Sequence, residues 1–211
     1  MVDNQETLGQ TELLLRERYS FIAKSKEEEI IIAITNFIDR QSKAEIPIKT
    51  TLDEMTSLIH RIFDFQYVCM AIKDSDGKYR YKTATGVTPE VKKNFFEIEY
   101  SLSELLDESL YPSSDVSDIT KMYMAESVPY TLDEVDTYSR PMLLGQKRES
   151  PDDMLEADYI DIYIKGKTKN ILGFIELTGT RNHKLPDRIT IRWIEIIARM
   201  LAIIFSREVG E

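Results

Sequence analysis

The chain has 211 residues, and 37 Asp and Glu against 27 Lys and Arg give it a formal charge of −10, which opposes direct binding to a nucleic acid or an anionic membrane. Its single cysteine, Cys69, excludes a disulfide framework and a thiolate metal cage within one chain. The longest apolar run is too short to span a bilayer, so we expect a cytoplasmic protein without a membrane partner. The sequence identifies no cofactor and no metal site.

The first 49 residues show helical periodicity in two places. One apolar segment lies within residues 13–22, and a second helix is predicted from about Lys26, where Ser25 and Glu28 fit a capping box. A break that contains Pro47 ends this helical region. We therefore expect an N-terminal helical segment, residues 1–49, that serves dimerisation or signalling, followed by a single domain of residues 50–211.

The next helix is predicted to begin at a second capping box, formed by Thr51 and Glu54, and to end near Phe63. A strand hairpin should follow at residues 64–85, because its two arms are rich in residues that suit a half-buried pleat and residues 74–77 supply a turn.

Alternate side chains of a strand face opposite sides, so Tyr67, Cys69 and Ala71 should share one face of the first arm, and the bulkier Val68, Met70 and Ile72 the other. On the second arm, the expected common face carries Tyr79, Tyr81 and Thr83.

The middle of the chain, residues 101–157, has weak periodicity and is punctuated by prolines and acidic clusters. It is predicted to be long connecting structure with short helices and strands, and Tyr138–Leu144 within it reads as an edge strand because of Pro141. The carboxylates near residue 152 suit a hard cation in principle, but a solvated charge run is the favoured interpretation.

The clearest hairpin signal lies at residues 159–177. Three isoleucines, at 160, 162 and 164, alternate with Asp161, Tyr163 and Lys165, which predicts one dry and one wet face. The apolar run of residues 171–177 instead predicts a strand that is buried on both faces. A hairpin this apolar needs a larger sheet and covering helices.

The last helix, residues 188–207, carries two apolar seams. One comprises Ile189, Trp193, Ile196, Met200 and Ile203, and the other comprises Ile194, Ile197, Leu201 and Ile204. A single wide stripe buried within one subunit is one interpretation. The alternative is a homodimer in which the terminal helices bundle with their symmetry mates.

This order of elements resembles the GAF domain family. The resemblance rests on the hairpin DFQYVCMAIKDSDGKYRYKTATG, the strand SRPMLL, the hairpin ADYIDIYIKGKTKNILGFIELTG and the apolar terminal helix, and it covers residues 51–207. It implies an α+β fold with a central antiparallel sheet of five or six strands. The N- and C-terminal helices would lie on one face of this sheet, and the middle segment would cover the other face as a lid.

The resemblance also implies a function. Family members commonly bind small molecules and pass the result through terminal helices, so we expect a non-enzymatic sensory domain that acts as a homodimer. Its output partner would be either a separate protein or a further part of a longer chain. The pocket is expected between the sheet and the lid, lined by Tyr67, Cys69, Ala71, Tyr79, Tyr81, Tyr138 and Arg140. The main alternative is a ligand-free dimerisation or protein-interaction module of the same fold. The third and least favoured function is catalysis by an unrecognised carboxylate or thiol, because the sequence shows no nucleophile–base pair.

Overall fold

The computed structural model describes residues 4–18, 25–43, 46–127 and 147–209, and the chain forms two compact units. The first unit, Met1–Glu45, contains helices α1 (Asn4–Arg18) and α2 (Lys26–Lys43). At the start of α2, the amide of Glu28 donates a hydrogen bond to Ser25 Oγ at 3.3 Å, as the predicted cap requires. The second unit, Ile46–Glu211, contains every strand that the structure describes.

Helix α3 (Ile48–Ile62) opens the second unit and begins earlier than its sequence pattern predicts. Pro47 occupies the N-cap with φ −55°, and no side chain caps the helix. Thr51 and Glu54 lie inside the helix, so the capping box predicted for this pair is wrong. Proline suits the first turn because its φ is already helical and its missing N–H would have no partner there.

The sheet is antiparallel throughout, and the α+β class is confirmed. It has seven strands in the order β3-β2-β1-β7-β6-β5-β4 rather than the predicted five or six. The strands are β1 (Phe65–Lys73), β2 (Tyr79–Thr85), β3 (Glu99–Tyr100), β4 (Ser114–Asp115), β5 (Thr120–Tyr123), β6 (Tyr159–Lys165) and β7 (Ile171–Thr180). Strands β3 and β4 have two residues each, which is too short to display a period of two in the sequence.

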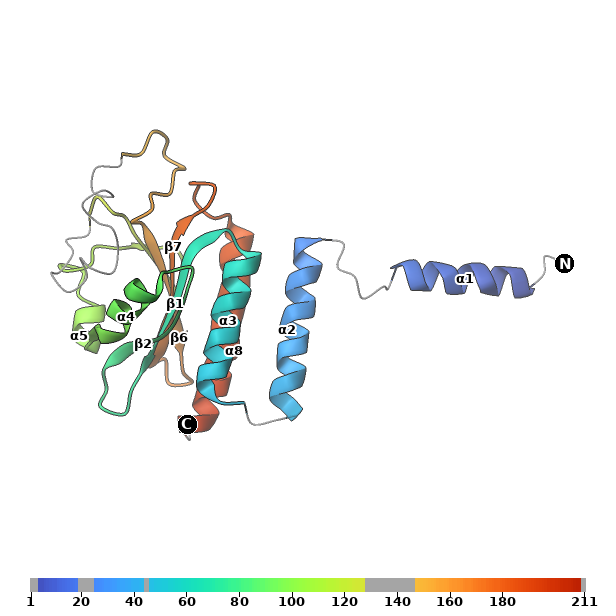
Figure 1. Cartoon of the computed structure of the whole chain (residues 1–211), viewed down its shortest axis with the longest axis horizontal. Coiled ribbons are helices and arrows are strands. Elements are labelled where there is room, and N and C mark those ends of the chain that lie inside the picture. Colours follow the sequence, from blue (N-terminus) through green and yellow to red (C-terminus); the bar gives the residue numbers. More distant parts are fainter. Residues whose placement is uncertain (1–3, 19–24, 44–45, 128–146, 210–211) are drawn as a thin grey trace. The chain divides into compact units, whose positions relative to one another are not determined.

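Helices cover the sheet unequally (Figure 1). On one face, here called the back face, α3 and α8 (Arg188–Val209) pack on the central strands. The shorter helices α4 (Pro89–Glu97) and α5 (Leu102–Leu105) lie on the other side, the front face. Val68 and Met70, two of the three bulkier side chains of the first arm, are fully buried and pair in register with Leu177 and Ile175, whereas the third, Ile72, is half-buried.

A β-bulge in β2 changes which side chains share a face. Met70 pairs with Thr83 but Ala71 pairs with Tyr81, so Lys82 is the extra residue. Thr83 consequently points to the back face, where its hydroxyl lies 3.2 Å from that of Thr56 on α3. The expected common face of Tyr79, Tyr81 and Thr83 is therefore wrong, because a bulge inverts the alternation beyond it.

The closing hairpin combines a confirmed prediction with a wrong one. All ten residues of β7 are buried, as expected for the centre of the sheet. Strand β6 is also buried from Tyr159 to Ile164, although its alternating sequence predicts a wet face. Asp161 and Tyr163 on that face are each only 3% exposed. The polar side chains of β6 face other parts of the protein rather than water.

Helix α8 separates its two seams. Ile194, Ile197 and Leu201 are completely buried against the sheet side of the unit. In the other seam, Ile189, Ile196 and Ile203 are 63%, 43% and 59% exposed. Within the described residues, no helix has the length and apolar character needed to cross a bilayer.

Candidate ligand-binding site

Two carboxyl groups lie side by side on the front face. Asp161 of β6 is the register partner of Glu176 of β7, which in turn is the partner of Cys69 of β1, so the three side chains share this face. Both carboxyl groups are buried, with 3% and 6% of the residue exposed. Burial, together with the charge of Glu176, raises the pKa of Asp161 well above its usual value. Asp161 Oδ1 is also the one buried side-chain polar atom in the described part of the chain without a hydrogen-bond partner.

Tyr81 covers the neighbouring part of the front face. Its hydroxyl donates a hydrogen bond to Glu176 Oε2 at 2.5 Å, although the two residues are on strands separated by β1. The ring can cross β1 because Ala71 and Cys69, the front-facing residues beneath it, have small side chains. Burial and the charge of Glu176 raise the pKa of the Cys69 thiol, which keeps it protonated and unreactive.

Three more tyrosines surround Asp161 on its other side. The rings of Tyr123 and Tyr159 are stacked with centroids 4.4 Å apart, and the hydroxyls of Tyr123 and Tyr163 lie 3.1 Å apart. Burial, followed by the charge of Asp161, raises the pKa of all three phenols. At neutral pH the acid pair is thus bordered by neutral aromatic side chains.

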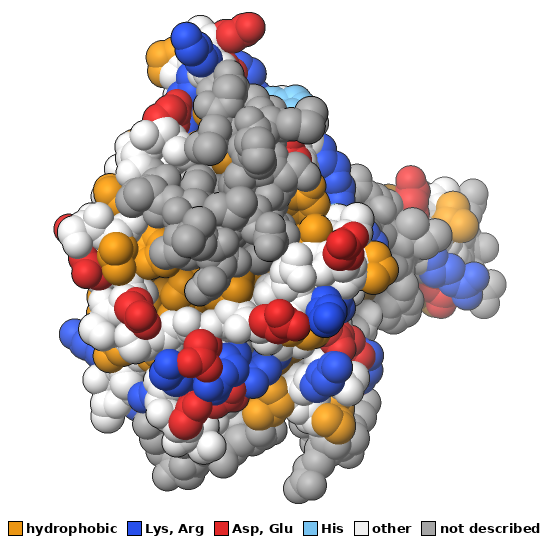
Figure 2. All heavy atoms as spheres, turned by 60° about the vertical axis from the view of Figure 1, so that its left-hand side comes forward, with side chains coloured by type: hydrophobic (Ala, Val, Ile, Leu, Met, Phe, Trp, Pro, Cys, Tyr) orange, Lys and Arg blue, Asp and Glu red, His pale blue; other side chains and the backbone are white. Residues whose placement is uncertain are grey.

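The outer part of the front face is also aromatic. The ring of Tyr81 makes T-shaped contacts with Phe95 of α4 and Tyr100 of β3, with centroids 5.0 and 6.3 Å apart. Tyr67, which is half-buried, donates a hydrogen bond to Glu156 at 3.3 Å. In Figure 2, described hydrophobic side chains gather near the centre of this face of the molecule, and a cluster of charged side chains lies below them.

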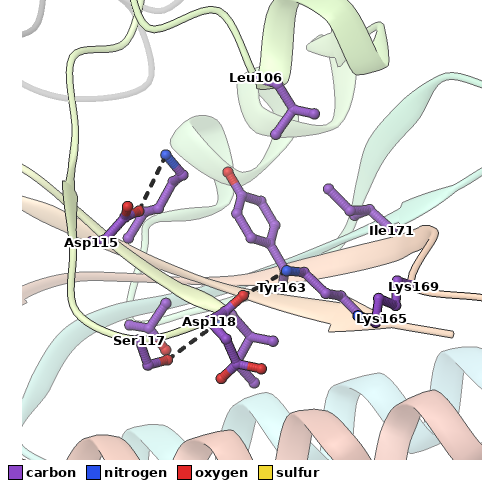
Figure 3. A pocket seen from close by; sticks show the side chains of 11 residues that line it. Leu106, Asp115, Ser117, Asp118, Tyr163, Lys165, Lys169 and Ile171 are labelled. Atoms are coloured by element: carbon purple, nitrogen blue, oxygen red, sulfur yellow. Dashed lines mark hydrogen bonds and ion pairs between the residues drawn. The ribbon is translucent and has the colours of Figure 1, made fainter.

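A small cavity adjoins this cluster where β5 and β6 approach α5 (Figure 3). Its volume is about 260 Å³, and Figure 3 shows Tyr163 pointing away from the two long helices and toward Leu106. Lys121, Lys165 and Lys169 also line it. Because Tyr163 both lines the cavity and hydrogen-bonds to Tyr123, the cavity is continuous with the tyrosine cluster.

Hydrogen bonds connect the wall of this cavity to α8. Ser117 and Thr120 line the cavity, and their hydroxyls donate to the same carboxylate oxygen of Glu195, the second at 2.8 Å. Glu195 is 2% exposed, and Arg192 donates to its other oxygen. The backbone of Tyr163 is joined to the same wall, since its amide donates to Ile119 O at 2.7 Å.

Asp158 and Arg148 fix the chain on both sides of the segment that the structure does not describe. Asp158 is fully buried and accepts hydrogen bonds from the amides of Ala125 and Leu155 and from Arg148, at 2.9, 2.7 and 2.6 Å. Arg148 also donates to Glu126 at 3.0 Å. One ion pair therefore holds together residues 125–126, 148 and 155–158. The remaining acids of this stretch, Asp152 and Asp153, pair with Lys184.

The predicted pocket residues fall into three groups. Tyr67, Cys69, Ala71 and Tyr81 lie together on the front face near Glu176. Tyr79 is completely buried and donates to Ile171 O at 2.8 Å, close to the end of the sheet and away from the acid pair. Tyr138 and Arg140, with the edge strand predicted around them, lie outside the described residues.

Sequence reasoning missed the acid pair and the tyrosines of β5 and β6. The available signal was Glu176, a charged residue within an otherwise apolar run that indicates a strand buried on both faces. A carboxylate in that position needs partners on the same face, and its cross-strand neighbours are where they should be sought.

Comparison with known proteins gives a fold but no sequence relative. No family model and no curated protein matches the sequence. Among solved structures, the GAF domain of an Acinetobacter phosphoenolpyruvate-protein phosphotransferase superposes with a TM-score of 0.54 at 9% identity, over 90% of this chain and 99% of that one. The corresponding domain from Coxiella burnetii gives 0.53 at 14% identity, over 88% and 99%.

A GAF domain from A. aeolicus, solved in an inactive state, gives a TM-score of 0.53 at 11% identity over 87% of this chain and 99% of that one. The chain has the GAF-domain fold. Within this GAF fold, the acid pair lies on the sheet face opposite the two long helices, the same face on which the sequence places the pocket.

The pH dependence of stability provides a test of the buried Asp161. A carboxyl group whose pKa is raised on folding keeps its proton where the unfolded chain, with an ordinary pKa of 3.8, has lost it. Stability should therefore fall as the pH rises above about 4, by up to about 1.4 kcal/mol for each pH unit below the folded pKa. In urea titrations, the stability of Asp161→Asn relative to the unmodified protein should rise between pH 4 and pH 8, and a constant difference would contradict this.

Proposed function

We propose that this chain is a non-enzymatic regulatory domain that binds a small molecule at the front face and transmits its presence to the terminal helices of a homodimer. The observation that carries the proposal is the acid pair of Asp161 and Glu176, buried beneath tyrosines with one carboxylate oxygen left without a partner. A buried polar group of this kind destabilises the fold, so its presence calls for a role other than packing. Ligand sites characteristically combine aromatic walls with a few convergent polar groups.

The contacts of Glu195 support transmission to α8. A ligand that displaces Tyr163 or the wall at residues 117–120 would disturb the hydrogen bonds of Ser117 and Thr120 to this buried carboxylate. Since Glu195 stands on α8 between the buried and the exposed seam, a change in its hydrogen bonds would alter the position of that helix. Transmission requires such differential contacts between the two states.

The first experiment is to look for a ligand that purifies with the protein. Native mass spectrometry and absorbance spectra of the purified chain should reveal a bound small molecule that is released on unfolding. Asp161→Leu should remove that molecule while the protein remains folded, because leucine fills a similar volume without a charge.

A ligand-free interaction module of the same fold is the second candidate. The observation in its favour is that the tyrosines contact one another and that Ala71 is completely buried, as they would be if the front face were a filled core. Under this function, native mass would show no added molecule and Asp161→Leu would only stabilise the protein.

The exposed seam of α8 leads to a prediction about assembly. Ile189, Ile196 and Ile203 recur every seven residues on one side of the helix, as expected of a surface that meets a partner helix. Sedimentation should show a homodimer, and Ile203→Glu should weaken it by at least about 30-fold, since a charge at a helix interface costs about 2 kcal/mol or more.

The matched control for this prediction is Val116→Glu, which introduces the same charge at an apolar residue that is 49% exposed but lies between β4 and β5. It should leave the dimer unchanged. A monomeric unmodified protein, or equal effects of the two substitutions, would contradict dimerisation through α8.

A further inference from the structure

We infer that the ligand of the front face carries a positively charged N–H group, such as an amidinium or a protonated amine, which Asp161 and Glu176 bind together. This inference rests on the proposed function, because it assigns a chemical class to the ligand of the same site. A site of this charge would reject anionic small molecules.

Asp161 has unused hydrogen-bonding capacity. Its Oδ1 accepts no hydrogen bond, although only 3% of the residue is exposed. Its neighbours do not supply a donor, because the hydroxyl of Tyr81 is directed to Glu176 and the hydroxyls of Tyr123 and Tyr163 contact each other. A ligand N–H would satisfy this oxygen, and a charged donor would do so most strongly.

The charged groups around Asp161 and Glu176 also favour a cation. The carboxyl groups come from adjacent strands, where partner side chains lie about 5 Å apart. Lys121 of β5 is the other register partner of Asp161, yet its ammonium group pairs with Glu108 and Asp115 at 3.1 and 3.4 Å. The described residues thus place two acids together and direct the cation of β5 elsewhere, while the charge of Lys92 on α4 acts on the neighbouring Cys69. Asp161 keeps its proton beside the buried charge of Glu176, and a cation would allow Asp161 to ionise as well, whereas an anionic ligand would be repelled by Glu176.

Aromatic side chains line the acid pair. Tyr81, Tyr123, Tyr159 and Tyr163 border the acid pair, and tyrosine rings attract a cation that lies over their faces. The adjoining cavity of about 260 Å³ is lined by Lys121, Lys165 and Lys169 and by neither acid, so the cationic group of the ligand would lie at the acid pair and not in this cavity. Acid and aromatic side chains together favour an organic cation over a metal ion, and no group of metal-ligating side chains occurs among the described residues.

Three probes of the same shape test the inference: benzamidine, which is cationic, benzamide, which is neutral, and benzoate, which is anionic. The full chain, freed of any bound molecule by unfolding and refolding, would be titrated with each by calorimetry and thermal denaturation at pH 7.5. Benzamidine at millimolar concentration should raise the unfolding midpoint, and benzamide and benzoate should bind at least about 10-fold more weakly. Binding should also release protons, detected as a dependence of the heat on the buffer, because Asp161 ionises when the cation arrives.

Two variants accompany the probes. Asp161→Asn should reduce benzamidine binding at least 10-fold and abolish proton release. Asp152→Asn removes the same charge from an exposed residue that pairs with Lys184, and it should leave benzamidine binding and proton release unchanged. If benzamide or benzoate binds as well as benzamidine, or if Asp161→Asn has no effect on the binding of benzamidine, the inference is wrong while a front-face ligand site remains. If none of the three probes binds and no molecule purifies with the protein, the proposed ligand site itself is overturned.

Discussion

Asp158→Ala is expected to lower the free energy of unfolding of the GAF-fold unit by about 3–5 kcal/mol, the range found when one partner of a buried ion pair is removed. The carboxylate is completely buried and holds the guanidinium of Arg148 at 2.6 Å and two backbone amides. Alanine would leave the two backbone amides without an acceptor, and Arg148, which is partly buried, would keep only its pairing with Glu126. Because domains of this kind are stable by only about 5–15 kcal/mol, the melting temperature should fall by many degrees.

Two further variants separate the contributions of Asp158. Asp158→Asn keeps the shape and one acceptor oxygen, so it should destabilise less than alanine does. Asp152→Ala removes an exposed carboxylate that pairs with Lys184, and it should leave the melting temperature almost unchanged. Chemical denaturation of the three variants gives the comparison. Equal stability of Asp158→Ala and Asp152→Ala would show that the bonds of Asp158 do not hold this part of the fold.

Gly86→Ala is expected to have an effect of similar size, about 3 kcal/mol or more, for two reasons that add. Gly86 follows β2 with φ +91°, where a side chain is strained. A Cβ there would also lie 2.0 Å from the carbonyl oxygen of Gln66, a backbone atom of β1 that cannot move without shifting the central strand. The same atom would lie 3.0 Å from Nε2 of His60.

Gly77→Ala is the matched control, because Gly77 has nearly the same φ, +86°, but no atom within 4 Å of the added Cβ. It should show the conformational penalty alone, about 1–2 kcal/mol. The difference between the two variants in urea denaturation therefore measures the clash. If Gly86→Ala is no worse than Gly77→Ala, then β1 yields to the added methyl group and the clash is not real.

Local patterns determined the elements of the second unit. The period of two around Ile160 and the continuous apolar run after residue 170 predicted the central hairpin, because burial on one or both faces leaves a direct trace in the sequence. The seams of the last helix likewise predicted α8, and the structure divides them into a buried seam and an exposed one. The bulge in β2 left no such trace, since one extra residue in a strand changes the pairing but not the composition.

The candidate site depended on contacts between distant residues. The sequence placed Tyr67, Cys69, Ala71 and Tyr81 together because alternation along one hairpin fixes their faces. It assigned Asp161 and Tyr163 to a wet face, because alternation separates two faces but does not say what covers the second one. Register between β6 and β7 then brought Asp161 beside Glu176, and Tyr123 came to it from β5, nearly 40 residues away along the chain. Which side chains share a face is thus a local property that sequence carries, whereas which of them lose contact with water is decided only when the strands assemble.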